Sequence, residues 1–433
     1  MSPELVGALG FAALFIFLAT GMPIGVGMGI VGAIGLCITL SVPAAVSKMA
    51  TAPFELVSNY TFSSLPLFLL MGHAIFSSGQ GGSIFKSAAK WFGRMPGGLA
   101  MATIAACALF GAVSASAVAT AVTMGLVALP EMKGRNYDAA LATGVVAAGG
   151  TIGSLIPPSN YLLIYGILTE NSIGRLFAGG VVPGIIVCFS YMVVIGIRCW
   201  KNPALGPHAG QYSIKEKIAS LKDIWEILAL GIFTIGGLIV GIFTATEAGA
   251  VGAGGAFVSA AIRRKLTWKG FSEAVLETLT TTGMIYAILV GAFIFNYFCA
   301  ASRLPTALAQ WVAGMALPPE GIMIVIVIIY LILGALMDEP SIQMLTTPIF
   351  YPLVMSLGFD PIWFGVIQCR LLEIGMIAPP VGMNVYVIAG LDKSVPMTTV
   401  FRGILWFLLM DIVTLALFVF WPGIITYLPS LMK

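Results

Sequence analysis

Charge is what this sequence of 433 residues most lacks. Only 9% of the residues are Asp, Glu, Lys or Arg, whereas 59% are hydrophobic. Soluble domains carry roughly a quarter charged residues, so a surface that faces water cannot be made from this composition. Most of the outer surface must face lipid, where a helix satisfies its own backbone hydrogen bonds. The composition therefore predicts an all-α polytopic membrane protein.

Side chains that bind metals or nucleic acids are scarce as well. The two His and six Cys show no paired spacing, which excludes a zinc site and a disulfide framework. A net charge of +3 is too small for a nucleic-acid footprint. The sequence contains no HExxH, no Walker Gly-x-x-x-x-Gly-Lys-[Ser/Thr] and no Gly-x-Ser-x-Gly motif. We therefore expect neither an enzyme nor an ATPase, and no organic cofactor.

Glycine, in contrast, is abundant, at 51 of 433 residues. The excess lies inside apolar segments, where glycine lets helices approach closely or break. The stretch from Gly27 to Gly32 matches the dinucleotide fingerprint GxGxxG, but no strand precedes it, so it predicts helix packing. No Lys or Arg precedes the first apolar run, Leu5 to Thr20, which is typical of a membrane helix rather than of a signal peptide.

The two halves of the sequence carry the same landmarks. Those of the first half are Gly111-Ala112, Pro130, Gly153, Pro157-Pro158 and Gly166, and those of the second are Gly334-Ala335, Pro352, Gly375, Pro379-Pro380 and Gly390. The offsets between them are 223, 222, 222, 222 and 224 residues. This regularity predicts a first repeat over 1–197, a polar linker over 198–225 and a second repeat over 226–433.

Lys and Arg are distributed oppositely in the matching loops of the two halves. The loops richer in basic residues are 262–272, 79–96, 131–138 and 391–402, and their poorer partners are 41–53, 298–306, 356–362 and 168–176. Basic residues gather in cytoplasmic loops, so matching loops should lie on opposite sides of the membrane. The pattern predicts two inverted-topology repeats.

These sides give a path of ten crossings and two re-entrant hairpins, with both termini outside. In the first repeat we expect scaffold helices near 5–20, 22–40, 54–78 and 177–197, an inner hairpin over 96–130 with its tip at 112–117, and a broken helix over 137–168. In the second we expect helices near 226–243, 245–262, 276–299 and 403–425, an outer hairpin over 320–356 with its tip at 334–341, and a broken helix over 361–391. Segments 79–95 and 303–317 would be arms that brace a mobile core, the first lying along the cytoplasmic surface.

The predicted tips and breaks indicate a transport site. Irregular backbone at membrane depth is tolerated only where protein or water satisfies its polar groups, so the two tips and two breaks should meet around a polar cavity. Freed carbonyls and hydroxyls in broken helices can bind hard cations such as Na⁺, and half-helix N-termini offer N–H groups to an anion. We therefore expect two or more coupling sodium ions.

Two sodium sites are expected, one in each repeat. The residues assigned to the first site are Ala112, Ser114, Ser116, Gly150, Thr151 and Pro157. By pseudo-symmetry, the residues assigned to the second site are Gly334, Met337, Asp338, Gly375, Ala378 and Met383. The alternative for Ser114 and Ser116 is that their hydroxyls bond to carbonyls of their own helix.

An anionic substrate is expected between the two sodium sites. The candidate substrate-binding residues are Ser116, Ser159, Asn160, Ser341, Arg370, Pro380 and Asn384. Arg370 is the best intramembrane counter-charge for an anion. Glu373 follows Arg370 by three residues on the same helical face, so the two could instead simply pair with each other.

Other ionisable residues in the apolar segments have structural alternatives. A carboxylate of Asp338 or Glu339 at the second tip could ligate a cation or cap a helix. Glu247 is better explained as a helix N-terminal cap than as a ligand. We interpret His73 and Asp411 as packing positions with satisfied hydrogen bonds rather than as a proton relay.

Several motifs together resemble those of one family. They are Gly153-Ser154-Leu155-Ile156-Pro157-Pro158-Ser159 within the run from Gly144 to Gly166, Phe243-Thr244-Ala245-Thr246-Glu247-Ala248, Leu345-Thr346-Thr347-Pro348-Ile349-Phe350, and Gly375-Met376-Ile377-Ala378-Pro379-Pro380-Val381-Gly382-Met383-Asn384. The combination spans nearly the whole chain and resembles the large membrane subunit of tripartite ATP-independent periplasmic (TRAP) transporters.

The resemblance implies a sodium-driven importer of the bacterial inner membrane, with a hairpin-containing core that moves as an elevator against a scaffold. In such a membrane the path predicted above places both termini in the periplasm. The resemblance also implies a separate small membrane subunit of about four helices and a periplasmic substrate-binding protein that delivers organic acids. Two features depart from the family. Ala378 replaces the usual Thr and removes a hydroxyl from the second sodium site, and the Asp338-Glu339-Pro340 tip is more acidic and stiffer than usual.

The alternative within transport is a stand-alone ion-coupled anion symporter of the related inverted-repeat superfamily. A channel would need a continuous polar pore, whereas the sequence offers two occluding hairpins. An intramembrane enzyme lacks its nucleophile, base or metal set. The substrate is expected to be a carboxylate or a sulfonate, and its identity stays open because selectivity in the family rests largely on the binding protein.

Overall fold

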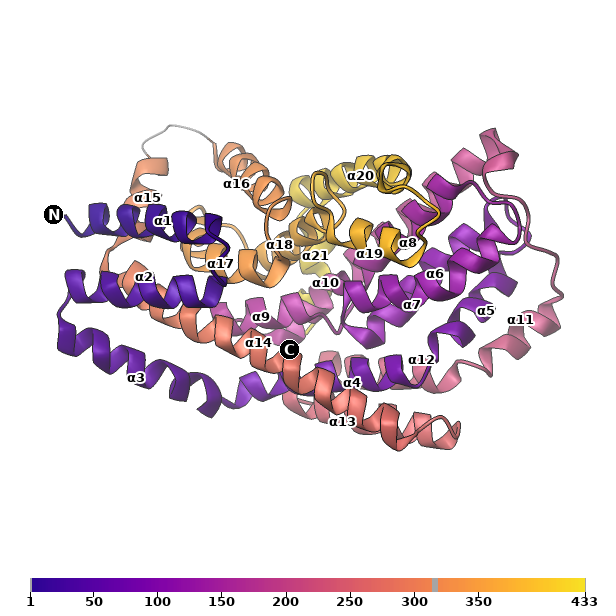
Figure 1. Cartoon of the computed structure of the whole chain (residues 1–433), viewed down its shortest axis with the longest axis horizontal. Helices are drawn as coiled ribbons and strands as arrows, with labels where there is room; N and C mark the ends of the chain where they lie inside the picture. The colour runs from indigo at the N-terminus through magenta and orange to yellow at the C-terminus, as the bar shows by residue number, and fades with distance from the viewer. Residues whose placement is uncertain (1, 314–317, 433) are drawn as a thin grey trace.

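The computed structural model describes residues 2–313 and 318–432 (Figure 1). Every regular element in these two ranges is a helix, and neither range contains a β-strand. The predicted all-α fold is therefore confirmed.

The first half of the chain contains ten α-helices and one short 3₁₀-helix in the described residues. They are α1 (Pro3–Ala19), α2 (Ile24–Thr39), α3 (Val42–Ser58), η1 (Tyr60–Ser63), α4 (Ser64–Ser77), α5 (Gly81–Phe92), α6 (Gly98–Ser114), α7 (Ala117–Lys133), α8 (Ala139–Leu155), α9 (Asn160–Thr169) and α10 (Ile173–Lys201).

The described residues that follow form a short linker and a second series of helices. They are η2 (Pro203–Leu205), α11 (Ile214–Leu221), α12 (Trp225–Val240), α13 (Ala245–Ile262), α14 (Trp268–Ala301), α15 (Leu304–Ala313), α16 (Pro319–Gly334), α17 (Glu339–Ser356), α18 (Pro361–Gly375), α19 (Met383–Leu391), α20 (Met397–Phe420) and α21 (Gly423–Ser430).

Six helical segments of the described chain are long and apolar enough to cross a membrane, and the bent pair α11–α12 is a seventh candidate. The six are Tyr60–Ser77, Ala139–Thr169, Ile173–Lys201, Ala245–Ile262, Trp268–Ala301 and Met397–Phe420. Four further apolar helices (α1, α2, α6 and α16) have only 16 or 17 residues, a length of about 24–26 Å against a hydrocarbon core of about 30 Å. The chain is a multi-pass membrane protein, and the number of ten crossings stays a prediction.

Helix boundaries agree with the predicted tips and breaks. Only Ala115 and Ser116 separate α6 from α7, and residues 335–338 separate α16 from α17. Residues 156–159 separate α8 from α9, and residues 376–382 separate α18 from α19. Each of the last two interruptions, 156–159 and 376–382, contains a Pro-Pro pair. Proline lacks the backbone N–H that would continue the helix, so the helix ends there. The inverted orientation of the two repeats in the membrane remains a prediction.

Polar residues start the helices that follow these interruptions. The hydroxyl of Ser116 accepts the N–H of Ala119 (3.3 Å) at the start of α7, and that of Ser159 accepts the N–H of Leu162 (3.2 Å) at the start of α9. The carboxylate of Asp338 caps α17 in the same way. Such caps satisfy the first N–H groups of a helix, so the local sequence determines where each half-helix begins.

Two parts of the structure differ from the sequence-based prediction. Residues 42–53 of the predicted loop 41–53 belong to helix α3. Ser41 caps this helix through the N–H of Ala44 (3.4 Å), and Pro43 occupies its first turn, where proline is favourable. The helix predicted over 54–78 accordingly starts later, as α4. Helix α21, after the last predicted helix, was not foreseen.

The predicted surface arm at 79–95 is helix α5. It buries Ile84, Phe85 and Ala88 while exposing 44% of Trp91. It packs against α6, α7 and α11, and Ser87 shares a hydrogen bond of 3.0 Å with Ser220 of α11. The second arm, predicted over 303–317, corresponds to α15, and its residues 314–317 lie outside the described residues.

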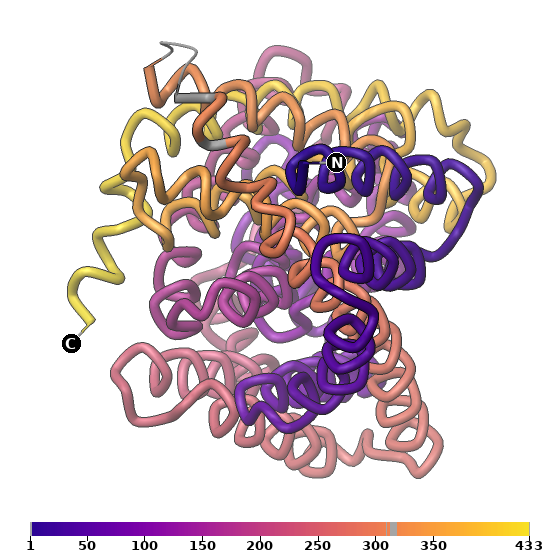
Figure 2. The backbone as a smooth tube through the Cα atoms, turned by 90° about the vertical axis from the view of Figure 1, so that its left-hand side faces the viewer, coloured from indigo at the N-terminus to yellow at the C-terminus, as the bar shows by residue number. Residues whose placement is uncertain are grey.

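Figures 1 and 2 show two groups of helices. The first group, called here the scaffold group, contains α2, α3, α4, α13 and α14, among which α14 packs on α2, α3 and α4, and α13 packs on α4. The second, called the core group, has α8 at its centre, in contact with α6, α7, α9, α18, α19 and α20, and it includes α17, which contacts α9 and α18. The groups meet where α4 contacts α6 and α9, and where α14 contacts α17.

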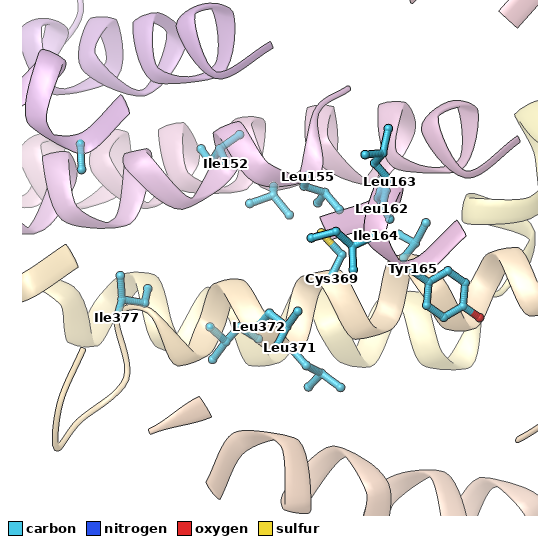
Figure 3. Close-up of a cluster of buried hydrophobic side chains, with 14 of the residues drawn as sticks. Ile152, Leu155, Leu162, Leu163, Ile164, Tyr165, Cys369, Leu371, Leu372 and Ile377 are labelled. Carbon is cyan, nitrogen blue, oxygen red and sulfur yellow. The ribbon is translucent and has the colours of Figure 1, made fainter. Parts of the chain in front are cut away.

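The two broken helices pack against each other within the core group. Figure 3 shows Ile152 and Leu155 of α8 and Leu162 of α9 facing Cys369 and other residues of α18. These side chains are buried. Burying apolar surface stabilises this contact by about 25 cal/mol per Å². Both breaks therefore belong to one compact unit.

Candidate functional site

A cavity of about 150 Å³ with both polar and apolar residues in its wall lies where the scaffold group meets the core group. The tip of the first hairpin contributes Ser114, Ala115 and Ser116, and the first broken helix contributes Asn160 and Tyr161. Pro340 reaches the cavity from the start of α17. The remaining wall comes from α4 and α14, with Gly72, His73, Thr281, Met284 and Ile285 among its residues. Residues of both tips and of the first break line this cavity, whereas none of the second break does, so the predicted meeting of two tips and two breaks is seen here only in part.

Three helices direct their N-terminal ends at this cavity. Ser116 caps α7, Asn160 is the first residue of α9, and Pro340 is the second residue of α17. Helix N-termini carry partial positive charge and N–H groups without intrahelical partners. The wall therefore favours a negatively charged group without needing a basic side chain.

The first tip is held by a small hydrogen-bond network. Ala115 adopts a left-handed conformation with φ of 53°, which reverses the chain between α6 and α7. Its carbonyl accepts the side-chain amide of Asn160 at 2.9 Å. The hydroxyls of Ser114 and Thr120 share a hydrogen bond of 2.9 Å. Ser114 therefore pairs with the hydroxyl of Thr120, and Ser116 caps α7. Neither of these contacts is the bond to a carbonyl of the same helix that was the alternative predicted for both residues.

Helix α4 approaches this tip at backbone distance. A Cβ atom built on Gly72 would lie 2.3 Å from the carbonyl oxygen of Ser114. Such a distance excludes any side chain at position 72. The tip thus abuts the scaffold group directly, and glycine at this position allows the contact.

The first break lies beside the first tip. Gly150, Thr151 and Pro157, assigned to the first sodium site, are all buried, and the Thr151 hydroxyl donates to the carbonyl of Ala148 at 2.8 Å. In the described structure the buried hydroxyl oxygen of Ser154 has no hydrogen-bond partner. Because a buried hydroxyl without a partner is costly, the region fits a bound cation or water.

The second tip has a different geometry. Asp338 accepts the N–H and the hydroxyl of Ser341 at 3.2 and 2.8 Å, so its carboxylate caps α17. Gly334 packs on Gly375, and a Cβ atom on Gly334 would lie 3.0 Å from the Cα of Gly375. Met337 is half-buried and Asp338 is exposed. Asp338 therefore caps a helix, which was the structural alternative predicted for a carboxylate at this tip.

The residues predicted to bind ligands at the second break differ in their exposure and contacts. Asn384 is buried, its side-chain amide donates to the carbonyl of Ala147 of α8 at 3.1 Å, and it lies beside Gly150, which is assigned to the predicted first sodium site. Ala378 is half-buried, whereas Pro380 and Met383 are exposed. Among the described residues, the cavity wall includes Ser116 and Asn160 of the candidate substrate-binding set and excludes the following: Ser159, Ser341, Arg370, Pro380 and Asn384.

Arg370 belongs to a fully buried ionic network. Its guanidinium donates to Glu373 at 2.8 Å and also to Asp411 of α20. The hydroxyl of Tyr191 on α10 donates to the same Asp411 oxygen at 2.5 Å. The pairing of Arg370 with Glu373 is therefore confirmed, and a contact with substrate stays a prediction. The three-residue spacing revealed Glu373, whereas nothing in the sequence linked Arg370 to Asp411.

Two further polar residues that were interpreted from the sequence, Glu247 and His73, lie at a helix start and in a cavity wall. The Thr244 and Glu247 side chains form a reciprocal capping box at the start of α13, so Glu247 is a helix cap as predicted. His73 lies in the wall of the central cavity and of a neighbouring cavity of about 440 Å³. Phe76 and Ala119 also line both cavities, and Glu273 and Glu277 line the second. The two cavities therefore lie side by side and share these wall residues.

The groups predicted to bind sodium in this region are carbonyl and hydroxyl oxygens. Within the described ranges, no three His, Cys, Asp or Glu side chains gather closely enough to hold a metal ion.

Sequence reasoning missed Tyr161, Gly72, Thr281 and Met284 in the cavity wall. Tyr161 follows Asn160 directly and could have been included with the break, whereas α4 and α14 give no local sign of proximity to the site.

The whole chain matches a known family and known relatives. Residues 11–424 match the model of the tripartite ATP-independent periplasmic transporter, DctM component. The chain is 36% identical over 407 residues to the C4-dicarboxylate TRAP transporter large permease protein DctM of Pseudomonas aeruginosa, covering 93% of each chain. It is also 31% identical over 388 residues to the isethionate TRAP transporter permease protein DctMQ of Oleidesulfovibrio alaskensis, covering 89% of this chain and 60% of that longer relative.

A solved structure shares the fold. The antimetabolite efflux pump MtrF of Neisseria gonorrhoeae superposes with a TM-score of 0.60 at 14% sequence identity, covering 97% of this chain and 95% of that chain. At this identity the likeness concerns the fold alone. The family match and the close relatives, which are transporter permeases and not enzymes, confirm the resemblance seen in the sequence motifs. This chain belongs to the DctM family, the large permease subunits of TRAP transporters.

Proposed function

We propose that the chain is the subunit of a sodium-coupled secondary importer that moves a carboxylate or sulfonate across the bacterial inner membrane. The observation that carries this proposal is the cavity between the first tip, the first break and the start of α17. Two relatives are named for C4-dicarboxylates and isethionate, which are a carboxylate class and a sulfonate. Both kinds of anion suit a wall made of helix N-termini.

The substrate anion binds at the N-terminal ends of α7 and α9 in this proposal. Ser116 and Asn160 lie there in the cavity wall. The other candidate residues, Ser159, Ser341, Arg370, Pro380 and Asn384, would contact it only after a rearrangement of the core group. Substrate selectivity then depends mainly on a periplasmic binding protein that delivers the anion.

Sodium would bind at the first tip and break, with a second ion at the second tip and break. The buried Ser154 hydroxyl of the first broken helix, which has no hydrogen-bond partner in the described structure, supports a cation in this region. The second site has weaker support, because Asp338 is engaged as a cap and Met383 faces outward. When bound, the ions would hold each tip against its break and so complete the substrate site.

The transport movement we propose is an elevator motion of the core group against the scaffold group. The cavity lies on the boundary of the groups, with Gly72 of α4 touching the first tip. The neighbouring cavity at Glu273 and Glu277 extends toward the side that the basic loop 262–272 predicts as cytoplasmic. The described conformation is thus best explained as open toward the cytoplasm, with both chain termini periplasmic.

The proposed complex needs a small membrane subunit of about four helices and a binding protein. We would reconstitute this chain into liposomes under an inward sodium gradient, alone and with both partners from the same operon, and follow labelled succinate and isethionate. Uptake only with both partners present supports the proposal. Uptake by this chain alone would identify a self-sufficient symporter, and uptake independent of sodium would refute sodium coupling.

A further inference from the structure

An apolar groove of about 410 Å³ lies between α5, α6 and α10, away from the central cavity. Phe92 and Met95 enter its wall from α5 and the turn that follows, and Met101 enters from α6. None of the residues in the wall is charged. On α10, Phe189 and Trp200 of the wall are 67% and 76% exposed. The groove therefore opens to the outside of the described helices.

One face of α10 forms the length of the groove. Its wall residues on this helix are Phe189, Met192, Val193, Gly196, Ile197 and Trp200. Spacings of three and four residues place them on the same face. A Cβ atom built on Gly196 would meet only the terminal methyl group of Met101, at 3.0 Å. Glycine thus leaves this stretch free, and flexible methionine side chains suit an irregular apolar ligand such as an acyl chain.

Two basic residues border one end of the groove. Arg94 directly precedes Met95 of the wall, and Lys201 directly follows Trp200. Both basic residues are exposed. No ion pair formed among the described residues includes either of them. The apolar wall therefore ends beside two cations that have no acidic partner.

Backbone hydrogen bonds hold these two cations at the same end of the groove. The N–H of Ala209, in the linker after α10, donates to the carbonyl of Gly93 at 2.9 Å. The ring Nδ1 of His208 donates to the carbonyl of Arg94, also at 2.9 Å. The turn that carries Arg94 is thus tied to the chain segment that follows Lys201. The pairing of an apolar wall with a basic end is fixed by the fold.

The surroundings of this end are basic as well. Segments 79–114 and 177–212, which include the groove, contain five Lys or Arg residues and no Asp or Glu. Basic residues gather on the cytoplasmic side. Helix α11 packs on α5, where Nζ of Lys217 lies 6.0 Å from the ring centroid of Trp91, and it leaves Ile214 exposed. A basic surface with exposed apolar side chains is typical of contact with anionic lipid headgroups.

We propose that the groove binds one anionic phospholipid of the leaflet predicted to be cytoplasmic, with an acyl chain along Phe189 and Gly196 and the phosphate at Arg94 and Lys201. A phospholipid combines the apolar and anionic parts that the two regions of the groove require. A zwitterionic headgroup would bring an ammonium group beside two cations, so a headgroup with net negative charge is favoured. The lipid would brace α6 of the first hairpin against α5 and α10. This inference does not depend on the proposed importer function.

Native mass spectrometry of the purified full chain tests the headgroup part. The chain is titrated in detergent with palmitoyl-oleoyl phosphatidylglycerol or with the corresponding phosphatidylethanolamine. We expect one phosphatidylglycerol to be retained at least fivefold more tightly than phosphatidylethanolamine. Arg94→Gln combined with Lys201→Gln should remove this preference. Equal retention of both lipids by the wild type, or an unchanged preference in this double variant, would overturn the proposal.

The matched control is Arg264→Gln combined with Lys265→Gln. These two residues are also an exposed Arg and Lys in a loop predicted to be cytoplasmic, but they do not line the groove. The control should keep the preference for phosphatidylglycerol. The same loss in both double variants would indicate attraction by surface charge in general and would refute a site in the groove.

Filling the groove tests the acyl-chain part. Gly196→Leu should reduce the retention of phosphatidylglycerol at least fivefold, because the leucine side chain occupies the space left by glycine. Gly254→Leu on α13 is the control, since that glycine has open space around it. If Gly196→Leu does not fold, the exposed pair Arg94 and Lys201 carries the test. Unchanged retention in folded Gly196→Leu would contradict binding in the groove.

A last titration adds the small membrane subunit from the same operon. Phosphatidylglycerol should stay bound to the complex and should still depend on Arg94 and Lys201. Displacement of the lipid would assign the groove to the small subunit and overturn the proposal. Each of these measurements is made without transport, so their outcome is separate from that of the uptake experiment.

Discussion

Gly111 of α6 and Gly153 of α8 touch through their backbones, so closely that a Cβ atom on Gly111 would lie 2.1 Å from the Cα of Gly153. The corresponding pair in the second half, Gly334 and Gly375, makes the same kind of contact. Each pair joins a hairpin to a broken helix next to its interruption. The two glycine contacts therefore set the distance between each tip and its break.

Gly111→Ala is expected to be severely destabilising. The added methyl group meets backbone that cannot move aside, and overpacking of this kind costs about 1–3 kcal/mol or more. Gly283→Ala is the matched control, because that helical glycine has open space around it and the change should be neutral or stabilising by up to about 1 kcal/mol. Thermal unfolding of both variants in detergent checks this, and equal melting temperatures would contradict the close contact.

Ser114→Ala combined with Ser116→Ala should weaken sodium activation of uptake by about tenfold or more. Loss of the Ser116 cap alone costs about 0.5–2 kcal/mol of stability, so folding must be followed in parallel. Ser190→Ala is the control, since its hydroxyl donates to a carbonyl of its own helix, α10. Sodium dependence of initial uptake rates is the measurement. An unchanged sodium dependence would remove the first sodium site from the proposal.

Arg370→Gln should destabilise the protein more than Glu373→Gln. The first change leaves two buried carboxylates without their cation, at a cost of about 3–5 kcal/mol, whereas the second leaves the Arg370–Asp411 pair in place. Unfolding by heat in detergent compares the two variants. Arg370→Gln combined with Asp411→Asn should recover part of the loss.

The same two variants test for a contact between Arg370 and the substrate. If Arg370 faces the anion in another state of the cycle, Arg370→Gln should reduce uptake far more than Glu373→Gln at equal amounts of folded protein. Losses that track stability in both variants would indicate a purely structural network.

A pH effect is expected from the loop that follows α19. Hydrogen bonds from Ser394, together with Lys133 at 3.3 Å, lower the pKa of Asp392. A carboxyl group with a lowered pKa stabilises the fold above its unfolded pKa of about 3.9, and this contribution disappears as the pH falls through the folded pKa. Because Lys133 is exposed and the Asp392 side chain is partly exposed, the effect should not exceed about 1 kcal/mol.

Asp392→Asn should therefore lower the melting temperature slightly at pH 7, and the difference from wild type should shrink as the pH falls through the folded pKa of Asp392. Asp223→Asn serves as a control for an exposed carboxylate. A difference between Asp392→Asn and wild type that persists in acid would show that the side chain acts through something other than its charge.

Much of the fold could be predicted from local patterns. Low charge and apolar runs determined an all-α membrane protein, because only helices satisfy their backbone within each lipid-facing segment. Ser116, Ser159 and the Pro-Pro pairs marked the tip and the breaks, since caps and prolines act on the residues beside them. The prediction of a loop over 41–53 was wrong. Ser41 caps a helix there, and the polar residues that follow it lie within that helix.

The site required the tertiary structure. Tyr161, Gly72 and Thr281 share one cavity wall although they come from helices far apart in the chain, and such contacts leave no periodic or spacing signal. Arg370 looked available for an anion because its spacing revealed only Glu373. Asp411 lies 41 residues further on, and packing alone brings it to the guanidinium. Local sequence thus determined where helices begin, break and end, whereas the packing of distant helices decided which polar groups are engaged with one another and which face the cavity.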